Sequence, residues 1–188
     1  CNGEYKFGVE NRTMGCHKHR SPINLIESIA TSCNTYYCHV YRGIIERQPN
    51  IHKGYDNWYK YVASFGLGNW LNNDLPTGRK GFLPNSEYYN KMYGHKGWKA
   101  LTNISLAIGQ DALLTTPIQM ANMTAAIANR GHYYTPHIVK NIENDTIPSR
   151  FNKAKYTLID SANFSIIIKG MQEVVENKEL GTSNTAKL

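Results

Sequence analysis

Ser32 and Asn34, separated by one residue, are the side chains of this sequence best suited to act together in chemistry. A hydroxyl both donates and accepts hydrogen bonds, and a carboxamide offers an acceptor oxygen beside a donor NH2 group. A Ser-x-Asn pair can therefore relay a proton and orient a partner. Ser and Asn are also preferred helix caps, so Asn34 could instead accept a hydrogen bond from the first turn of a following helix. For an isolated Ser-x-Asn, capping is the more common role.

The segments on either side of residues 31–35 predict two amphipathic helices. Apolar residues recur at helical spacing before and after it: Ile23, Ile26, Ile29 and Ala30, then Tyr37, Val40, Tyr41, Ile44 and Ile45. In an extended connection, residues two apart share a face, whereas in a continuous helix they point about 200° apart. We therefore expect a joint between helices that aims Ser32 and Asn34 at one spot.

Cys1, Cys16, His17 and His19 form a second group of reactive side chains. The residues between the two cysteines predict two short strands and a turn, which would bring Cys1 near Cys16. Thiolates and imidazoles are zinc ligands, although this spacing matches no standard zinc finger. A Cys1–Cys16 disulfide is the alternative in an oxidising compartment. A disulfide, a metal site and free thiols all stay open, because four cysteines in a chain of this length are compatible with each.

Composition places the chain among globular proteins. Its 188 residues are 41% hydrophobic, which suits one domain with a sizeable core. No run approaches the ~20 apolar residues of a membrane span, and no signal peptide is present. The formal charge of +7 arises from 21 Lys and Arg against 14 Asp and Glu, but the basic residues are scattered and no nucleic-acid motif is present. We expect no nucleic-acid partner, and a polyanion binder is kept as an alternative.

The middle of the chain predicts helices that are separated by an irregular stretch. A third amphipathic helix ends at Phe65-Gly66-Leu67-Gly68, and residues 69–98 show no sustained period, which is typical of a binding loop. Thr116 and Pro117 predict a capped helix that ends at Gly131. One face of this helix carries Ile118, Ala121, Ala125 and Ala128.

The last third of the sequence predicts an extended arm and a final helix. Residues 133–142 favour a strand, at a sheet edge because Pro136 lacks an N–H donor. Residues 146–160 form a polar connection. A helix then begins at Ser161, and its single apolar stripe should lie in the core: Phe164, Ile167, Ile168, Met171, Val174 and Val175.

Several stretches together resemble one family. In chain order they are Ser32-Cys33-Asn34-Thr35-Tyr36-Tyr37, Phe65-Gly66-Leu67-Gly68, Asp74-Leu75-Pro76, Ile108-Gly109-Gln110, Thr116-Pro117-Ile118-Gln119-Met120-Ala121 and Ile127-Ala128-Asn129-Arg130-Gly131. Their order and spacing over nearly the whole chain are similar to the transpeptidase domain of class B penicillin-binding proteins. The likeness is strongest to elongation-type members, in a version similar to those of Bacteroides-like bacteria.

That family carries three active-site motifs, Ser-x-x-Lys, Ser-x-Asn and Lys-Thr-Gly, and this sequence holds the middle one. No Ser is followed by Lys three residues later, and no Lys is followed by Thr-Gly or Ser-Gly. We expect residues 1–188 to be an excised, partial transpeptidase domain between the two absent motifs. The resemblance implies an α+β class, with this piece a mostly helical part of the penicillin-binding transpeptidase (serine β-lactamase-like) fold.

The resemblance also implies a reaction. A Ser outside residues 1–188 would attack the D-Ala-D-Ala carbonyl of a peptidoglycan stem peptide, release D-Ala and pass the acyl group to an amine on a neighbouring strand. Ser32 would relay a proton to the leaving nitrogen, and Asn34 would orient a lysine ammonium and the substrate backbone. β-Lactam antibiotics would acylate the same absent Ser as substrate mimics.

Partners and location follow from the same resemblance. It implies peptidoglycan stem peptides, β-lactam antibiotics and elongation-machinery membrane proteins as partners, and no cofactor. It places the protein on the periplasmic face of the cytoplasmic membrane, anchored by a segment absent from residues 1–188, where Cys1 and Cys16 would be oxidised together or metal-bound. A catalytically inactive wall-binding or partner-docking module of the same fold is the alternative.

Overall fold

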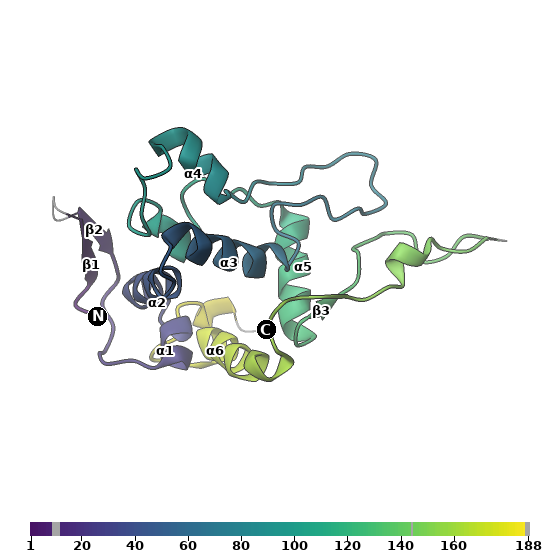
Figure 1. The fold of residues 1–188 in the computed structure, drawn as a ribbon. Coiled ribbons are helices and arrows are strands. Elements are labelled where there is room, and N and C mark those ends of the chain that lie inside the picture. The colour runs from purple at the N-terminus through teal and green to yellow at the C-terminus, as the bar shows by residue number, and fades with distance from the viewer. Residues whose placement is uncertain (9–11, 144, 187–188) are drawn as a thin grey trace. The chain divides into compact units, whose positions relative to one another are not determined.

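The computed structural model of the chain describes residues 1–8, 12–143 and 145–186, so the turn predicted around residues 9–11 lies outside the described part. Its strands and helices, with 3-10 helices written as η, follow in chain order (Figure 1): β1 Glu4–Phe7, β2 Arg12–Gly15, α1 Leu25–Ala30, α2 Asn34–Glu46, α3 Ile51–Ala63, α4 Ser86–Tyr93, η1 Ile104–Ile108, α5 Pro117–Ala128, β3 His132–Tyr133, η2 Ser149–Phe151, β4 Lys155–Tyr156, η3 Ser161–Asn163, α6 Phe164–Glu176 and η4 Asn184–Ala186.

These elements form two compact units. The first unit comprises Cys1–Trp58, Asn85–Asp111 and Ser165–Leu188, and the second comprises Tyr59–Pro84 and Ala112–Phe164. Helices dominate the described residues, and the strands form two short antiparallel pairs, β1 with β2 and β3 with β4. The predicted α+β, mostly helical class is therefore confirmed.

The first unit begins with a hairpin, as the sequence predicted. β1 and β2 pair antiparallel, with Glu4 opposite Gly15. Just beyond the pair, the Cys16 N–H donates to the Gly3 carbonyl at 2.8 Å. This bond closes the open end of the hairpin, so that Cys1 and Cys16 lie near each other as expected.

A short joint separates α1 from α2, which confirms the predicted break between two helices. α1 begins with a capping box, in which the side chains of Asn24 and Glu27 satisfy each other's backbone N–H groups. The helix ends at Ala30, and Ser32 takes a left-handed conformation with φ of +50°. Because a positive φ is unusual for a residue with a side chain, the helix cannot continue through Ser32.

The buried face of α2 differs in part from the predicted apolar stripe. Tyr41 and Ile45 are buried as expected, but Val40 and Ile44 are 41% and 45% exposed. Cys38, which is fully buried, lies on the inner face instead. A free Cys packs as a small hydrophobe, so a pattern built on the larger apolar residues overlooks it.

The core of the first unit is aromatic. Tyr55, Tyr89 and Trp98 are at most 2% exposed, and their ring centroids lie 5.3–5.6 Å apart. The polar tips of two of these side chains have partners: the Tyr89 hydroxyl donates to Asp111 at 2.6 Å, and Trp98 Nε1 donates to Asn90 Oδ1 at 2.8 Å. An unpaired polar group would be costly at this depth, so these bonds fix how the rings sit in the core.

α4 corrects the prediction that residues 69–98 are irregular throughout. Asn85 caps this helix by accepting the Tyr88 N–H at 2.9 Å, and Gly94 ends it with φ of +77°. Tyr89 is the buried residue of its eight, so the sequence shows no apolar period. The packing of one ring into the aromatic core, together with the cap, stabilises a helix that periodicity does not reveal.

α5 begins as the sequence predicts. Thr116 and Gln119 form a capping box, and Pro117 occupies the first turn, where a missing N–H costs nothing. The helix ends at Ala128, and Gly131 follows with φ of +104°. The predicted capped helix is confirmed.

The buried face of α5 is nevertheless polar. Gln119 and Asn122 are 1% and 3% exposed, whereas the apolar face expected from helical spacing is exposed or half-buried: Ile118, Ala121, Ala125 and Ala128. Asn122 Nδ2 donates to the Phe65 carbonyl at 2.9 Å. Gln119 Nε2 donates at 2.9–3.1 Å to three loop carbonyls, those of Gly66, Asn69 and Lys80. Loop carbonyls lack the partners that a helix or sheet supplies, so these amides are drawn inward to satisfy them.

The region after α5 has less strand than predicted. β3 covers His132 and Tyr133 and pairs with β4, which lies in the predicted polar connection. Beyond Tyr133, the described chain forms an isolated bridge between Ile142 and Asp145 in place of a longer strand. Pro136, which cannot donate to a ladder, interrupts any continuation of β3.

α6 carries the predicted apolar stripe, and the stripe is buried in part. In the second unit, Phe164 is 3% exposed and its ring lies 6.4 Å from that of Phe65. In the first unit, α6 lies beside α1 (Figure 1), and a Cβ added to Gly170 would lie 2.5 Å from Ile29 Cδ1. Met171 is 38% exposed, so the prediction that the whole stripe lies in the core is wrong at this position.

The helices α2, α3 and α6 have 13 residues each. At a rise of about 1.5 Å per residue such a helix spans roughly 20 Å, less than the ~30 Å hydrocarbon core of a bilayer. Within the described residues, none of the helices has the length and apolar character to cross a membrane.

Replacing Gln119 with Ala should lower the free energy of unfolding by about 3 kcal/mol or more, because three loop carbonyls lose their donor and each unsatisfied group costs ~1–3 kcal/mol. Gln172→Ala, at an exposed position of α6, is the matched control and should change stability by less than about 0.5 kcal/mol. Chemical denaturation followed by tryptophan fluorescence measures both. Equal stability of the two variants would contradict this role of Gln119.

Candidate functional site

The joint between α1 and α2 presents Ser32 to solvent. Its side chain is exposed, and its backbone N–H donates to the Ile29 carbonyl at 3.0 Å. Among the residues that the structure describes, no partner is recorded for the Ser32 hydroxyl. The backbone is thus fixed while the hydroxyl faces solvent.

Asn34 is the first residue of α2, and its side chain is tied to the hairpin. Asn34 Nδ2 donates to the Gly15 carbonyl at 2.8 Å. The capping alternative for Asn34 is wrong, because the N-cap of α2 is Cys33, whose Sγ accepts the Tyr36 N–H at 3.4 Å. The amide of Asn34 is therefore positioned by a contact that reaches across to another element.

His17 packs against the joint. Its Nε2 lies 2.6 Å from the Thr31 carbonyl, and the Thr31 hydroxyl donates to the Glu27 carbonyl at 2.7 Å. These contacts hold the residue that precedes Ser32. His17 is not among the side chains whose ligand atoms come together, so the predicted metal group that included His17 is corrected at this position.

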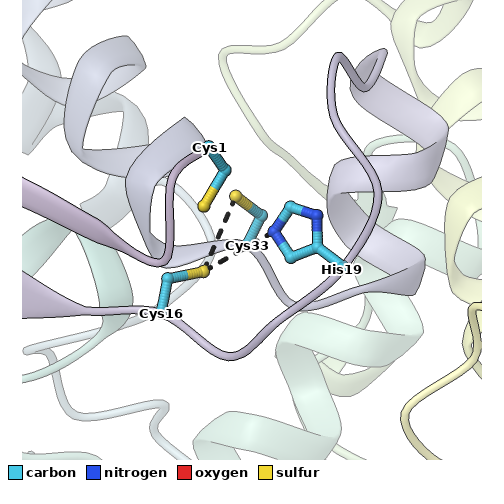
Figure 2. Close-up of side chains that lie close together, drawn as sticks. All are labelled: Cys1, Cys16, His19 and Cys33. Carbon is cyan, nitrogen blue, oxygen red and sulfur yellow. Dashed lines mark hydrogen bonds between the residues drawn. The ribbon is translucent and has the colours of Figure 1, made fainter.

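Four ligand atoms of the first unit converge on one point. The Sγ atoms of Cys1, Cys16 and Cys33 and a ring nitrogen of His19 all lie within 4.8 Å of one another. Figure 2 shows the four side chains turned toward a common centre, from the start of the chain, the segment after β2 and the joint. The structure thus brings together three of the four side chains expected from the sequence, and replaces His17 by Cys33.

Two distances within this group match tetrahedral zinc coordination. Cys16 Sγ lies 3.8 Å from Cys33 Sγ and 3.7 Å from His19 Nε2. With Zn–S near 2.3 Å and Zn–N near 2.0–2.1 Å, a tetrahedral site requires S···S of about 3.8 Å and S···N of about 3.6 Å. A Cys3His donor set of this kind suits Zn²⁺, and four protein ligands make a closed, structural site.

Neighbouring groups orient the ligands. His19 Nδ1 lies 2.7 Å from the Arg20 carbonyl, which selects the tautomer that donates from Nδ1 and leaves Nε2 free to bind a metal. The Tyr36 N–H donates to Cys33 Sγ, and Cys1 Sγ lies 3.3 Å from the Thr35 hydroxyl. Such outer contacts are typical of metal ligands, because they set the ring orientation and stabilise thiolate charge.

Cys38 differs from the ligand cysteines in its surroundings. Burial raises the pKa of the Cys33 thiol, and nearby Cys16 raises it further. A bound divalent cation reverses this effect, since coordinating thiols are deprotonated. Burial also raises the pKa of Cys38 to about 11, and its sulfur lies outside the group of four. Cys38 is therefore an inert thiol within the core.

The sequence analysis missed Cys33 because that residue occupies the middle position of the Ser-x-Asn motif. The one sequence feature that could have indicated Cys33 as a metal ligand is that it is the next cysteine after Cys16. All four cysteines are free thiols in the structure, so a disulfide between Cys1 and Cys16 is not formed. Of the three states left open by the sequence, the geometry favours a metal site.

Comparisons with known proteins agree on one family. A family model described as "Penicillin binding protein transpeptidase domain" matches residues 3–187. The peptidoglycan D,D-transpeptidase MrdA of Acinetobacter baumannii is 34% identical over 119 residues, which are 63% of this chain and 16% of the relative. The enzyme of the same name from Haemophilus influenzae is 29% identical over 166 residues, 87% of this chain and 24% of the relative.

Solved structures share the fold. The chain resembles the crystal structure of Pseudomonas aeruginosa PBP2 in complex with WCK 5153, with a TM-score of 0.77 and 26% identity over 97% of this chain and 38% of that one. Penicillin-binding protein 3 of a mycobacterium in complex with aztreonam gives a TM-score of 0.71 at 21% identity, over 99% of this chain and 39% of that one. The chain spans about a quarter or less of the curated relatives named above. The likeness to Bacteroides-like members stays a prediction.

The chain should bind one Zn²⁺, and Cys33→Ser or His19→Ala should weaken that binding about 100-fold or more, because each removes one ligand of a closed site. Cys38→Ser and His17→Ala are the matched controls and should keep the stoichiometry. Competition with a chromogenic chelator measures the affinities, and thiol titration counts the protected cysteines. Equal zinc binding by Cys33→Ser and Cys38→Ser, or four equally reactive thiols in zinc-loaded protein, would contradict the assignment.

Proposed function

The chain belongs to the family of penicillin-binding protein transpeptidase domains, and on that premise we propose that it forms part of a peptidoglycan D,D-transpeptidase. The observation that carries the proposal is the pair at the joint, with Ser32 exposed and Asn34 held by the hairpin. Both curated relatives described above bear the name of this enzyme. The substrate is the D-Ala-D-Ala end of a peptidoglycan stem peptide, and β-lactam antibiotics react as its mimics.

The reaction is a two-step acyl transfer. The hydroxyl of a serine outside residues 1–188 attacks the carbonyl carbon between the two D-Ala residues, and the C–N bond breaks as the terminal D-Ala leaves with a proton. The amine of a second stem peptide then attacks the acyl-enzyme and gives up a proton as the serine oxygen leaves. Each step needs a group that moves a proton near the scissile nitrogen.

Ser32 and Asn34 supply different parts of that chemistry. The Ser32 hydroxyl can accept a proton from a neighbouring lysine and donate its own to the leaving nitrogen. Asn34 Nδ2 is bound to the Gly15 carbonyl in the described structure. Its Oδ1 stays available to a lysine ammonium, and the second hydrogen on Nδ2 is available to the substrate backbone. The hairpin contact fixes the plane of this amide, so Asn34 is oriented before the substrate arrives.

The metal centre supports the pair structurally. We assign Zn²⁺ to Cys1, Cys16, His19 and Cys33, where four protein ligands leave no open position for substrate. The ion would tie the end of the hairpin to the joint, with one ligand between Ser32 and Asn34. When bound it supplies folding free energy and charge compensation for the thiolates.

Location and partners follow from the proposed reaction. Peptidoglycan cross-linking takes place on the periplasmic face of the cytoplasmic membrane, so an anchor outside residues 1–188 would hold the protein there. Membrane proteins of the elongation machinery would be its partners through that longer polypeptide. A catalytically inactive wall-binding or partner-docking module is the alternative, and no observation in the described structure favours it.

The 188-residue chain alone should form no covalent adduct with a fluorescent penicillin, because it has no Ser-x-x-Lys nucleophile. Denaturing gel electrophoresis after incubation measures the label, with the intact polypeptide that carries the motif as positive control. A serine of the 188-residue chain covalently labelled, as shown by peptide mass spectrometry, would refute this division of roles.

Ser32→Ala and Asn34→Ala in the intact polypeptide should each slow β-lactam acylation by roughly 10²–10⁴-fold, because a positioned proton-transfer or orienting group is lost. Stability should change little for Ser32→Ala and fall by about 1 kcal/mol for Asn34→Ala, which loses its bond to the Gly15 carbonyl. Second-order acylation rates and melting temperatures measure the two effects.

The matched controls for these variants are Ser149→Ala and Asn152→Ala, which replace exposed residues of the second unit. Both controls should acylate at the wild-type rate. If Ser32→Ala and Asn34→Ala also acylated within about threefold of wild type, the catalytic assignment would be withdrawn and a purely structural role would remain.

A further inference from the structure

We propose that Cys16 and Cys33 are a disulfide-forming pair, and that their oxidation by a disulfide-bearing oxidant expels the metal ion and disturbs the Ser-x-Asn motif. The proposal goes beyond the reaction above, and its effect on acylation rests on the proposed function. Its chemistry, a reversible covalent modification of a metal centre, stands on the arrangement of the four ligands.

The two sulfurs are already close. Cys16 Sγ and Cys33 Sγ lie 3.8 Å apart, and an S–S bond of about 2.05 Å requires them to approach by less than about 2 Å. Cys16 follows the last residue of β2 and begins a segment without helix or strand up to residue 24. Movement of that segment can bring the sulfurs together without displacing either helix. A longer approach would be needed to reach Cys38, whose sulfur lies outside the group.

The exposure of the two cysteines determines which of them reacts first with the oxidant. Cys33 is fully buried, whereas Cys16 is partly exposed and can meet an oxidant from solvent. The Cys16 thiolate attacks one sulfur of the oxidant, forms a mixed disulfide and releases the other oxidant sulfur as a thiolate. The Cys33 thiolate then attacks Cys16 Sγ, which forms the Cys16–Cys33 bond and releases the second oxidant thiolate. Two electrons pass from the pair to the oxidant, and the metal ion loses two thiolate ligands.

The ion cannot remain after this step. Cys1 and His19 are the ligands left, and two protein ligands do not make the closed tetrahedral site that holds structural zinc. The zinc ion is therefore released in the same step as the disulfide forms. Reduction of the disulfide restores both thiolates and the site.

Oxidation also reaches the catalytic pair. Cys33 lies between Ser32 and Asn34, and its sulfur accepts the Tyr36 N–H as the cap of α2. Asn34 is bonded to the carbonyl of Gly15, the residue before Cys16. A new bond between Cys16 and Cys33 therefore shifts the Gly15 carbonyl relative to Asn34 and disturbs this hydrogen bond. Asn34 then loses the contact that fixes its amide, so the Ser-x-Asn motif is disturbed although neither helix moves.

The test uses the intact, zinc-loaded polypeptide and oxidised glutathione as the probe. Oxidation should release about one equivalent of zinc to a chromogenic chelator, and peptide mass spectrometry should find Cys16 linked to Cys33. Reduction followed by added zinc should reverse both changes. Zinc retained throughout the oxidation, or a disulfide that joins Cys1 to either cysteine in place of Cys16–Cys33, would overturn the proposal.

One variant separates metal binding from oxidation. Cys16→Asp keeps an oxygen ligand for zinc but removes one sulfur of the pair, so it should bind zinc and release it at least about tenfold more slowly under oxidised glutathione. Cys38→Ser, which leaves the four ligands intact, should behave as wild type. Zinc release from Cys16→Asp at the wild-type rate would contradict the proposed pair. If this variant does not fold, the disulfide map of the wild-type protein decides alone.

The β-lactam acylation rate reports the coupling to the catalytic pair. It should fall at least about tenfold on oxidation and recover on reduction and zinc addition, while Cys16→Asp stays insensitive. An unchanged rate in protein whose Cys16–Cys33 disulfide is complete would overturn the coupling. Reduced, zinc-loaded protein that does not acylate at all would count against the proposed function, and the disulfide map would still decide the redox pair.

Discussion

The convergence of four ligand atoms within 4.8 Å is the constraint on which the first unit depends. It joins three segments that hydrogen bonds also connect: the start of the chain, the segment after β2 and the joint before α2. Three thiolates packed so closely would repel one another, and a bound cation would offset that repulsion. The same contacts determine the position of Cys33 and hence the backbone on either side of it. The proposed catalytic pair and the proposed metal site therefore share one short stretch of backbone.

In the second unit, side-chain amides hold the loops in place. Here the chain between α3 and α4 is irregular, and its carbonyls have few partners of their own. Gln119 and Asn122 on α5 satisfy them with side-chain amides, which share the buried face of the helix with Ala126. Each unit therefore relies on polar groups inside it to hold loops in place, by metal ligands in one and by amides in the other.

Local signals in the sequence predicted most of the helices, and failed where distant contacts decide. The capping box at Thr116 and the break at Ser32 depend on residues that are neighbours in the sequence, so the sequence alone predicts them. The inward face of α5 could not, because the carbonyls that attract Gln119 lie about 40–50 residues away in sequence. α4 was missed because Tyr89 is its one buried residue, so no apolar period marks it in the sequence. Cys33 was missed as a ligand because the hairpin, the connection and the joint meet only after folding.

The sequence positions of the metal ligands affect the order of folding. All four lie within residues 1–33, so the loops between them are short and their closure costs little chain entropy. Contacts between residues close in sequence form faster than those that join distant segments. A chain that emerges from its N-terminal end can therefore complete this centre before α5 or α6 is available. The backbone geometry around Ser32 and Asn34 would then be set before the later helices form.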